Sequence, residues 1–223
     1  TLFRSSAASD VYKRQGQTIG DGWQIESQRH HKNGIISAIA EQIVINVFGR
    51  KKPIKFCDIY GDYLLSCELL MSDYINVKNA TQVIKDDFDL NVIKKYLGAD
   101  FSNNLNVVID SDVVSKIPGG CDVISCIDIL KDESTEEATE LLQKSLDVLN
   151  SGGIVIFRQK DNSKDINNKI ISNLKFSKHI QYSSIVATEH KNNVDIAHYS
   201  DAIFNELKNE NENRSNVFDI LYK

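Results

Sequence analysis

The chain has 223 residues, of which 41% are hydrophobic, and a formal net charge of -5 at pH 7. This composition can bury one substantial core, and the acidic balance disfavours a protein that binds chiefly by neutralising nucleic-acid phosphates, although it is compatible with a local basic patch. The sequence has no run of roughly 18 apolar residues and no charged-then-apolar leader, so we expect a cytoplasmic protein with neither a membrane span nor a secretory signal.

The first 15 residues do not look like part of a domain. Residues 1–15 lack an initiating Met and any hydrophobic period, and they resemble a translated adapter of the kind found in assembled metagenomic reading frames. We expect them to be disordered and the true N-terminus to be missing, which leaves residues 16–223 as a single domain. In the polar segment 16–34, a solvated loop is the simpler interpretation of His30 and His31, which are also the first candidates to test as a catalytic base.

An apolar helix precedes the first expected strand. Residues 35–48 are broadly apolar and predict a helix that ends at Gly49. Residues 54–59, with the sequence IKFCDI, predict a strand, and residues 60–63 predict a turn into a helix over 64–71. The turn therefore lies at the carboxyl end of that strand.

Two more strands are expected before the middle of the chain. Residues 81–87 predict the second strand, and Asp89 is the expected N-cap of a helix that runs to residue 96. Residues 106–110 predict the third strand. The alternation of strand and helix is typical of a doubly wound parallel sheet, in which ligands bind at the carboxyl ends of the strands.

The clearest pattern is a strand, a helix and a strand between residues 122 and 157. Residues 122–130 and 154–157 are apolar on consecutive rather than alternate positions, as in strands that are covered on both faces. Between them, Ser134 and Glu137 have the spacing of a capping box, and Gly152 and Gly153 are expected to stop the helix. Such a crossover is almost always right-handed and predicts a parallel sheet.

This stretch also resembles a known family. The text DVISCIDIL, followed by SLDVLNSGGIVIF, is similar to the fourth strand, the next helix and the fifth strand of class I S-adenosylmethionine-dependent methyltransferases. The resemblance covers about residues 35–222. It implies an α/β, Rossmann-like fold with helices on both faces of a mostly parallel seven-stranded sheet, a sixth strand near 180–187 and an antiparallel last strand over 216–222. Helices are expected near 169–174, before the sixth strand, and near 200–208, between the last two strands.

The resemblance also implies a cofactor loop after the first strand. Asp58 matches the acidic residue of the family pattern Asp/Glu-x-Gly-x-Gly-x-Gly, whose glycines let the backbone approach the methionine end of the cofactor. Tyr60, Asp62 and Leu64 stand where glycines are usual, and Gly61 is one place out of register. A residue other than glycine in a glycine-only conformation costs about 1–3 kcal/mol, so the loop is expected to take another path or to carry strain.

Three more acidic residues fall at family positions. By resemblance, Asp87 would accept the ribose hydroxyls of the cofactor, with Asp86 as the alternative, and Asp112 would contact the adenine amino group. Asp128 would lie near the sulfonium or orient the acceptor. Asp is also frequent in strand-to-helix loops without any binding role. The text after Asp128 is not the Asn/Asp-Pro-Pro-Tyr with which amino-methylating nucleic-acid enzymes hold a flipped base, so a nucleic-acid acceptor is not expected.

Three functions are compatible with these patterns. The leading hypothesis is methyl transfer from S-adenosylmethionine to a small-molecule acceptor. The alternative is a methyltransferase-like scaffold or partner subunit that no longer catalyses, and a Tyr60 or Tyr63 side chain filling the cleft would favour it. A third hypothesis, another nucleotide-binding doubly wound enzyme, would be favoured by a parallel last strand. The four cysteines form no Cys-x-x-Cys pair, so we expect free thiols and no metal site.

Overall fold

The computed structural model describes residues 36–37, 39–60, 65–70, 72, 74–84, 104–129, 134–158, 164–183 and 217–223. Residues 1–15 and the helices expected over 89–96 and 200–208 lie outside this part of the chain. Within it, no helix combines the length and the apolar character that a membrane crossing requires.

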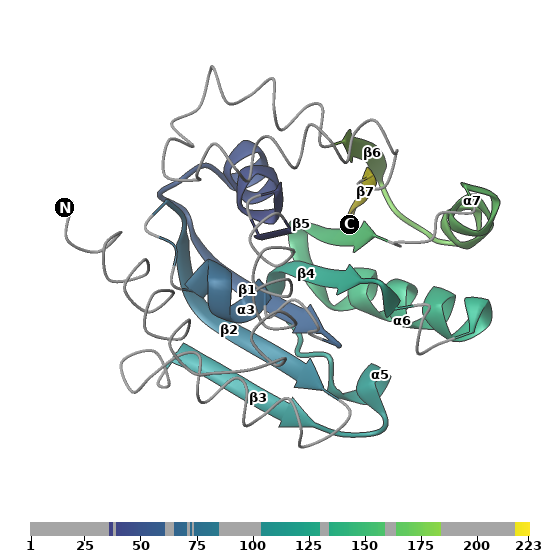
Figure 1. Cartoon of the computed structure of the whole chain (residues 1–223), viewed down its shortest axis with the longest axis horizontal. Helices are drawn as coiled ribbons and strands as arrows, with labels where there is room; N and C mark the ends of the chain where they lie inside the picture. Colours follow the sequence, from purple (N-terminus) through teal and green to yellow (C-terminus); the bar gives the residue numbers. More distant parts are fainter. Residues whose placement is uncertain are drawn as a thin grey trace, which may run out of the picture.

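The strands form one seven-stranded sheet in the order β3-β2-β1-β4-β5-β7-β6. Their bounds are Pro53–Ile59 for β1, Asn76–Ile84 for β2, Leu105–Ile109 for β3, Cys121–Ile127 for β4, Leu149–Arg158 for β5, Lys178–Ser183 for β6 and Val217–Tyr222 for β7. Strands β1 to β5 pair in parallel, and β7 pairs antiparallel with both β5 and β6. The arrowheads of β1 to β5 accordingly point to the same side of the molecule (Figure 1). The predicted fold class and the antiparallel last strand are confirmed.

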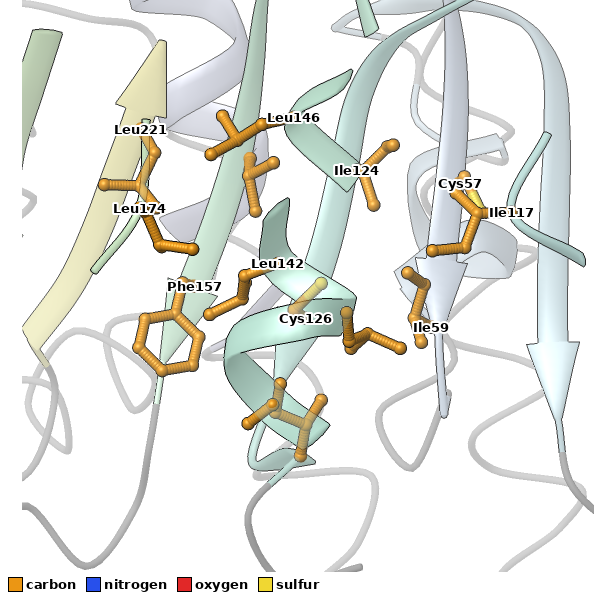
Figure 2. Close-up of a cluster of buried hydrophobic side chains, with 14 of the residues drawn as sticks. Cys57, Ile59, Ile117, Ile124, Cys126, Leu142, Leu146, Phe157, Leu174 and Leu221 are labelled. Atoms are coloured by element: carbon orange, nitrogen blue, oxygen red, sulfur yellow. The ribbon is translucent and has the colours of Figure 1, made fainter. Parts of the chain in front are cut away.

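Helices cover both faces of the sheet. The helix over 36–48 and α3, Leu65–Leu70, pack on one face through a cluster that includes Ile43, Phe56 and Leu69. The helices α5, α6 and α7 belong to the second face and span Val113–Lys116, Thr135–Val148 and Lys164–Ser172. Figure 2 shows side chains of this second cluster, among them Ile124 and Cys126 of β4 and Leu142 of α6. Because β4 contributes to both clusters, its residues are apolar at consecutive positions.

The helix α6 begins as predicted and ends earlier than predicted. The Ser134 Oγ accepts the Glu137 N–H at 3.2 Å, and the Glu137 Oε2 accepts the Ser134 N–H at 2.8 Å, so the capping box is confirmed. The helix ends at Val148, and β5 already includes Gly153. A Cβ at Gly153 would lie 2.9 Å from the Asn150 carbonyl oxygen, so glycine is needed there for a close backbone approach rather than to stop the helix.

Two other elements differ from their predicted bounds. Strand β2 begins at Asn76, five residues earlier than predicted, because its hydrogen bonds to β1 are made by the backbone and do not require the apolar side chains on which the prediction rested. Helix α7 begins at Lys164, also five residues early, and buries Ile170 and Ile171. Neither shift changes the face of the sheet on which a residue lies.

Candidate functional site

Asp58 lies at the centre of a buried polar network at the carboxyl end of β1. Its side chain is 2% exposed, and its Oδ2 accepts the Leu65 N–H at 3.1 Å, at the start of α3. Its Oδ1 accepts the Ser125 hydroxyl of β4. Gln82 of β2 donates to the Asp58 carbonyl oxygen at 3.3 Å and accepts the Ser66 hydroxyl of α3. The network therefore joins three strands to the helix that follows the loop.

The same network sets the charge state of Asp58. Burial raises the pKa of the Asp58 carboxyl to about 6, and the hydrogen bonds from Ser125, Gln82 and Leu65 oppose part of that rise. The sequence pattern did not identify Ser125 or Gln82. The available signal was that Ser125 lies between the buried apolar residues Ile124 and Cys126 of its strand; Gln82 follows the polar Thr81 and gave no such signal.

Tyr60 adopts the backbone conformation that glycine usually supplies at this place. Its φ is 68°, and its N–H donates to the Val83 carbonyl oxygen at 2.9 Å. A side chain in this left-handed region costs on the order of 1–2 kcal/mol. Its ring is buried in the same cluster as Val113 and Leu141, and that burial offsets the strain. Tyr60 itself is therefore strained, and the rest of the expected loop, residues 61–64, lies outside the described residues.

A depression of about 170 Å³ lies beside Tyr60 at the carboxyl edge of the sheet. Asp112 lines it as the N-cap of α5, where its Oδ1 accepts the Ser115 N–H at 3.2 Å while the residue stays exposed. Glu137 and Glu140 of α6 also line it. The depression is therefore lined by three acidic residues, of which Glu137 already accepts the Ser134 N–H, and this lining favours a ligand with hydrogen-bond donors or positive charge.

Asp128 is buried against Arg158 where β4 and β5 end. Its φ is 56°, its N–H donates to the Arg158 carbonyl oxygen at 2.7 Å, and its Oδ2 lies 3.3 Å from the Arg158 Nη1. The two residues are only 7% and 5% exposed, and the Arg158 guanidinium lies 5.7 Å from the centre of the Phe218 ring. Arg158 was missed by the sequence analysis, although an Arg that ends an apolar strand needs a partner when it is buried.

Two of the four cysteines, Cys67 and Cys126, are unreactive thiols, whereas a hydrogen bond with Cys57 lowers the pKa of Cys121. All four are free and buried. Burial raises the pKa of Cys67 and of Cys126 to about 12, so both thiols stay protonated at neutral pH. They belong to the packing of the sheet, as Figure 2 shows for Cys126.

The structure brings together four of the residues that the sequence singled out. Asp58, Tyr60, Asp112 and Asp128 all follow or end strands at the same edge of the sheet, and Tyr60 and Asp112 line the same depression. The side-chain oxygens of Asp58 are engaged by Leu65 and Ser125, which leaves Asp112 as the exposed acceptor. The other candidates lie outside the described residues; they are His30, His31, Gly61, Asp62, Tyr63, Asp86 and Asp87.

Comparisons with known proteins agree on the architecture. No protein-family model and no curated sequence matches the chain. Among solved structures, a candidate O-methyltransferase from Nostoc punctiforme matches with a TM-score of 0.56 at 14% identity over 84% of this chain and 56% of that one. An rRNA methylase from Streptococcus thermophilus matches with a TM-score of 0.54 at 11% identity, over 83% and 93% of the two chains. A methyltransferase from Pyrococcus furiosus matches with a TM-score of 0.53 at 17% identity, over 83% and 82%.

These likenesses define a class of fold. The chain has the Rossmann-like fold of class I methyltransferases, with the strand order and the reversed β7 described above. It spans little more than half of the Nostoc punctiforme protein. At identities of 11% to 17%, the likeness shows the fold and leaves substrate and activity to be argued from the site.

Proposed function

We propose that the chain transfers a methyl group from S-adenosylmethionine to a small-molecule acceptor. The observation that carries the proposal is the placement of Asp112, Glu140 and Tyr60 around one depression at the carboxyl edge of a methyltransferase-type sheet. Ligands of doubly wound sheets bind at this edge. A parallel last strand would have favoured another nucleotide-binding enzyme, but β7 is antiparallel to its neighbours.

The depression formed by the described residues would accommodate part of S-adenosylmethionine. A space of about 170 Å³ is smaller than the roughly 300–1,000 Å³ of pockets for drug-sized ligands, so it would hold one ring system and not a whole nucleoside with its side arm. The exposed Asp112 carboxylate would accept from an adenine amino group. Asp87 would hold the ribose, and Tyr60 to Asp62 would face the methionine end.

In the proposed reaction the protein has mainly to align the acceptor with the methyl group. When bound, S-adenosylmethionine supplies a methyl group on a sulfonium centre whose sulfur is a good leaving group. The acidic edge would favour that positive charge, and the protein would align the acceptor with it and exclude water. His30 and His31 are the first residues to test as a base, and the pair of Asp128 and Arg158 lies where an acceptor would approach β4 and β5.

Separate observations support a small-molecule acceptor and a cytoplasmic location. The segment after β4 lacks the Asn/Asp-Pro-Pro-Tyr text that holds a flipped base, which supports a small-molecule acceptor. The four buried free thiols are compatible with the reducing cytoplasm.

Calorimetric titration with S-adenosylhomocysteine tests the binding. We expect saturable heat with the wild type and affinity at least about tenfold weaker for Asp112→Ala and Asp87→Ala, since a hydrogen bond to a charged group contributes about 1.5–3 kcal/mol. Glu136→Gln is the matched control, because Glu136 is exposed in the first turn of α6 and does not line the depression. A wild-type protein that gives no heat would refute the proposal.

A scaffold without catalysis is the second candidate, and the buried Tyr60 ring favours it. Tyr60 lines the depression and is buried. If the chain is a scaffold, the wild type will not bind S-adenosylhomocysteine, and Tyr60→Gly will bind only if the ring alone blocks the site. If it is an enzyme, the wild type binds and Tyr60→Gly changes the affinity without creating it.

A further inference from the structure

The edge of the sheet opposite the depression carries a row of exposed basic side chains. We call this row the cationic rim; its members are Arg50, Lys51, Lys52, Lys55, Lys78, Lys178 and Lys223. They lie before or near the amino ends of β1, β2 and β6 and at the carboxyl end of the antiparallel β7. The chain as a whole has a net charge of -5, so the rim is a local reversal of sign.

Hydrogen bonds along this edge join the segments that carry the rim. Between β2 and β1, the Asn76 side chain donates to the Lys51 carbonyl oxygen at 3.3 Å. Between β1 and β4, the Lys55 N–H donates to the Asp122 carboxylate at 2.9 Å. The Lys223 N–H donates to the Gly153 carbonyl oxygen at 3.2 Å, which ties the end of β7 to β5. The backbone that carries the basic residues is therefore held together by hydrogen bonds.

Aromatic rings lie beneath three of the cations. The Lys52 Nζ is 4.3 Å from the centre of the Phe48 ring, and the Lys178 Nζ is 5.3 Å from that of Tyr222. The Arg50 guanidinium lies 5.7 Å from the Tyr74 ring. Basic side chains together with aromatic rings are the combination with which proteins follow a nucleic-acid strand.

The described residues provide little negative charge to cancel the rim. Asp122 lies 4.0 Å from the Lys52 Nζ, and its side chain is 13% exposed and also accepts from Asn150. Asp147 is exposed next to Lys223, whose Nζ donates to the Asp147 carbonyl oxygen at 2.6 Å. The rim thus holds seven basic residues against two carboxylates, with its positive excess at β1 and β2.

We infer that the cationic rim binds the phosphate backbone of a nucleic acid. From β2 to β6 the edge crosses five strand spacings, about 24 Å in all, with the basic residues at its two ends, on β2 and β1 and on β7 and β6; this span matches the rise of about seven phosphates along one nucleic-acid strand. The rim is not suited to membrane insertion or to binding an apolar protein surface. The two exposed large hydrophobic residues among those described, Ile109 and Ile166, are not part of it. The acidic depression at the other edge would face away from the bound strand.

Fluorescence anisotropy of a fluorescein-labelled 20-nucleotide RNA, single-stranded and as a duplex, tests this surface. Neutralising about four phosphates predicts that the affinity for the single strand falls about 50-fold between 50 and 200 mM salt, and that the affinity for the duplex, with its higher charge density, falls more steeply. The double variant Lys51→Ala, Lys55→Ala should weaken binding at least about tenfold at 50 mM salt and reduce the salt slope by about 2. The arm that binds more tightly identifies the form of nucleic acid.

The control removes the same charge elsewhere. Lys144→Ala with Lys169→Ala changes two exposed lysines on α6 and α7 that are not part of the rim, and it should bind RNA like the wild type. Equal losses in both double variants, no anisotropy change with the wild type, or tighter binding to vesicles containing phosphatidylserine than to RNA would each overturn the inference. The result is independent of S-adenosylhomocysteine binding, because the rim and the depression are at opposite edges.

Discussion

The buried carboxyl of Asp58 gives a sharp prediction about stability. Its pKa rises from 3.8 to about 6 on folding, chiefly because it is removed from water. The unfolded chain releases this proton near pH 4, whereas the folded protein keeps it until about pH 6. Stability from this group is therefore fully present below the unfolded pKa and is lost as the pH rises through the folded pKa. A shift of this size corresponds to about 3 kcal/mol, most of it lost between pH 4 and pH 7.

The substitution Asp58→Asn isolates that contribution. Asn keeps the shape and an oxygen that can accept the Leu65 N–H, but it cannot ionise. We expect the free energy of unfolding of the wild type to fall by about 2 kcal/mol relative to Asp58→Asn between pH 4 and pH 7. The difference is taken between the two proteins at each pH, so that other titrating groups cancel.

Urea unfolding at five pH values between 4 and 8 measures this difference. Glu136→Gln is the control, since it removes an exposed carboxylate from the start of α6 and should follow the wild type at every pH. A difference between the wild type and Asp58→Asn that stays flat would contradict the argument. So would a wild type that gains stability relative to the variant, because the hydrogen bonds from Leu65 and Ser125 would then outweigh the cost of burial.

Three further predictions concern a close backbone approach at Gly153, the positive φ of Tyr60 and the buried Arg158. Gly153→Ala should lower the unfolding free energy by about 1–3 kcal/mol in urea, whereas Gly119→Ala, whose Cβ would meet nothing within 4 Å, should stay within about 0.5 kcal/mol of the wild type. Tyr60→Gly should be more stable than Tyr60→Ala by about 1 kcal/mol in thermal melts, since only glycine relieves the positive φ; the reverse order would argue against strain. Arg158→Met should lower the unfolding free energy by about 3–5 kcal/mol, because it removes the guanidinium that pairs with the buried Asp128 carboxylate. Adding Asp128→Asn should recover part of this loss, and no recovery would argue against the ion pair.

The fold could be predicted because its signals are local. A capping box at Ser134 and consecutive apolar residues on either side of α6 define a crossover from a stretch of fewer than about 40 residues. A crossover of this kind restricts the sheet to parallel pairing, and the family resemblance supplied the reversed last strand. The start of β2 could not be found in this way, because Asn76 joins the sheet by backbone pairing alone.

The polar network could not be predicted because its partners are distant in sequence. Ser125 and Asp58 are 67 residues apart, and they meet only because β1 and β4 pair in one register. A lone Ser in an apolar strand indicates that some buried partner exists, but it does not say which one. The same limit applies to Arg158, whose partner lies on the neighbouring strand.

Two acidic residues of the candidate site, Asp58 and Asp128, have partners within the fold, whereas Asp112 is exposed. Asp58 matches the family position, yet its carboxylate accepts from Leu65 and Ser125, so its presence is explained by the folding of α3 onto the sheet whether or not a cofactor binds. Asp128 is likewise buried against Arg158. Asp112 differs, since it is exposed at the mouth of the depression and contributes little to the core. Loss of ligand binding in Asp112→Ala without loss of stability would therefore report function, whereas the same loss in Asp58→Ala would not separate binding from folding.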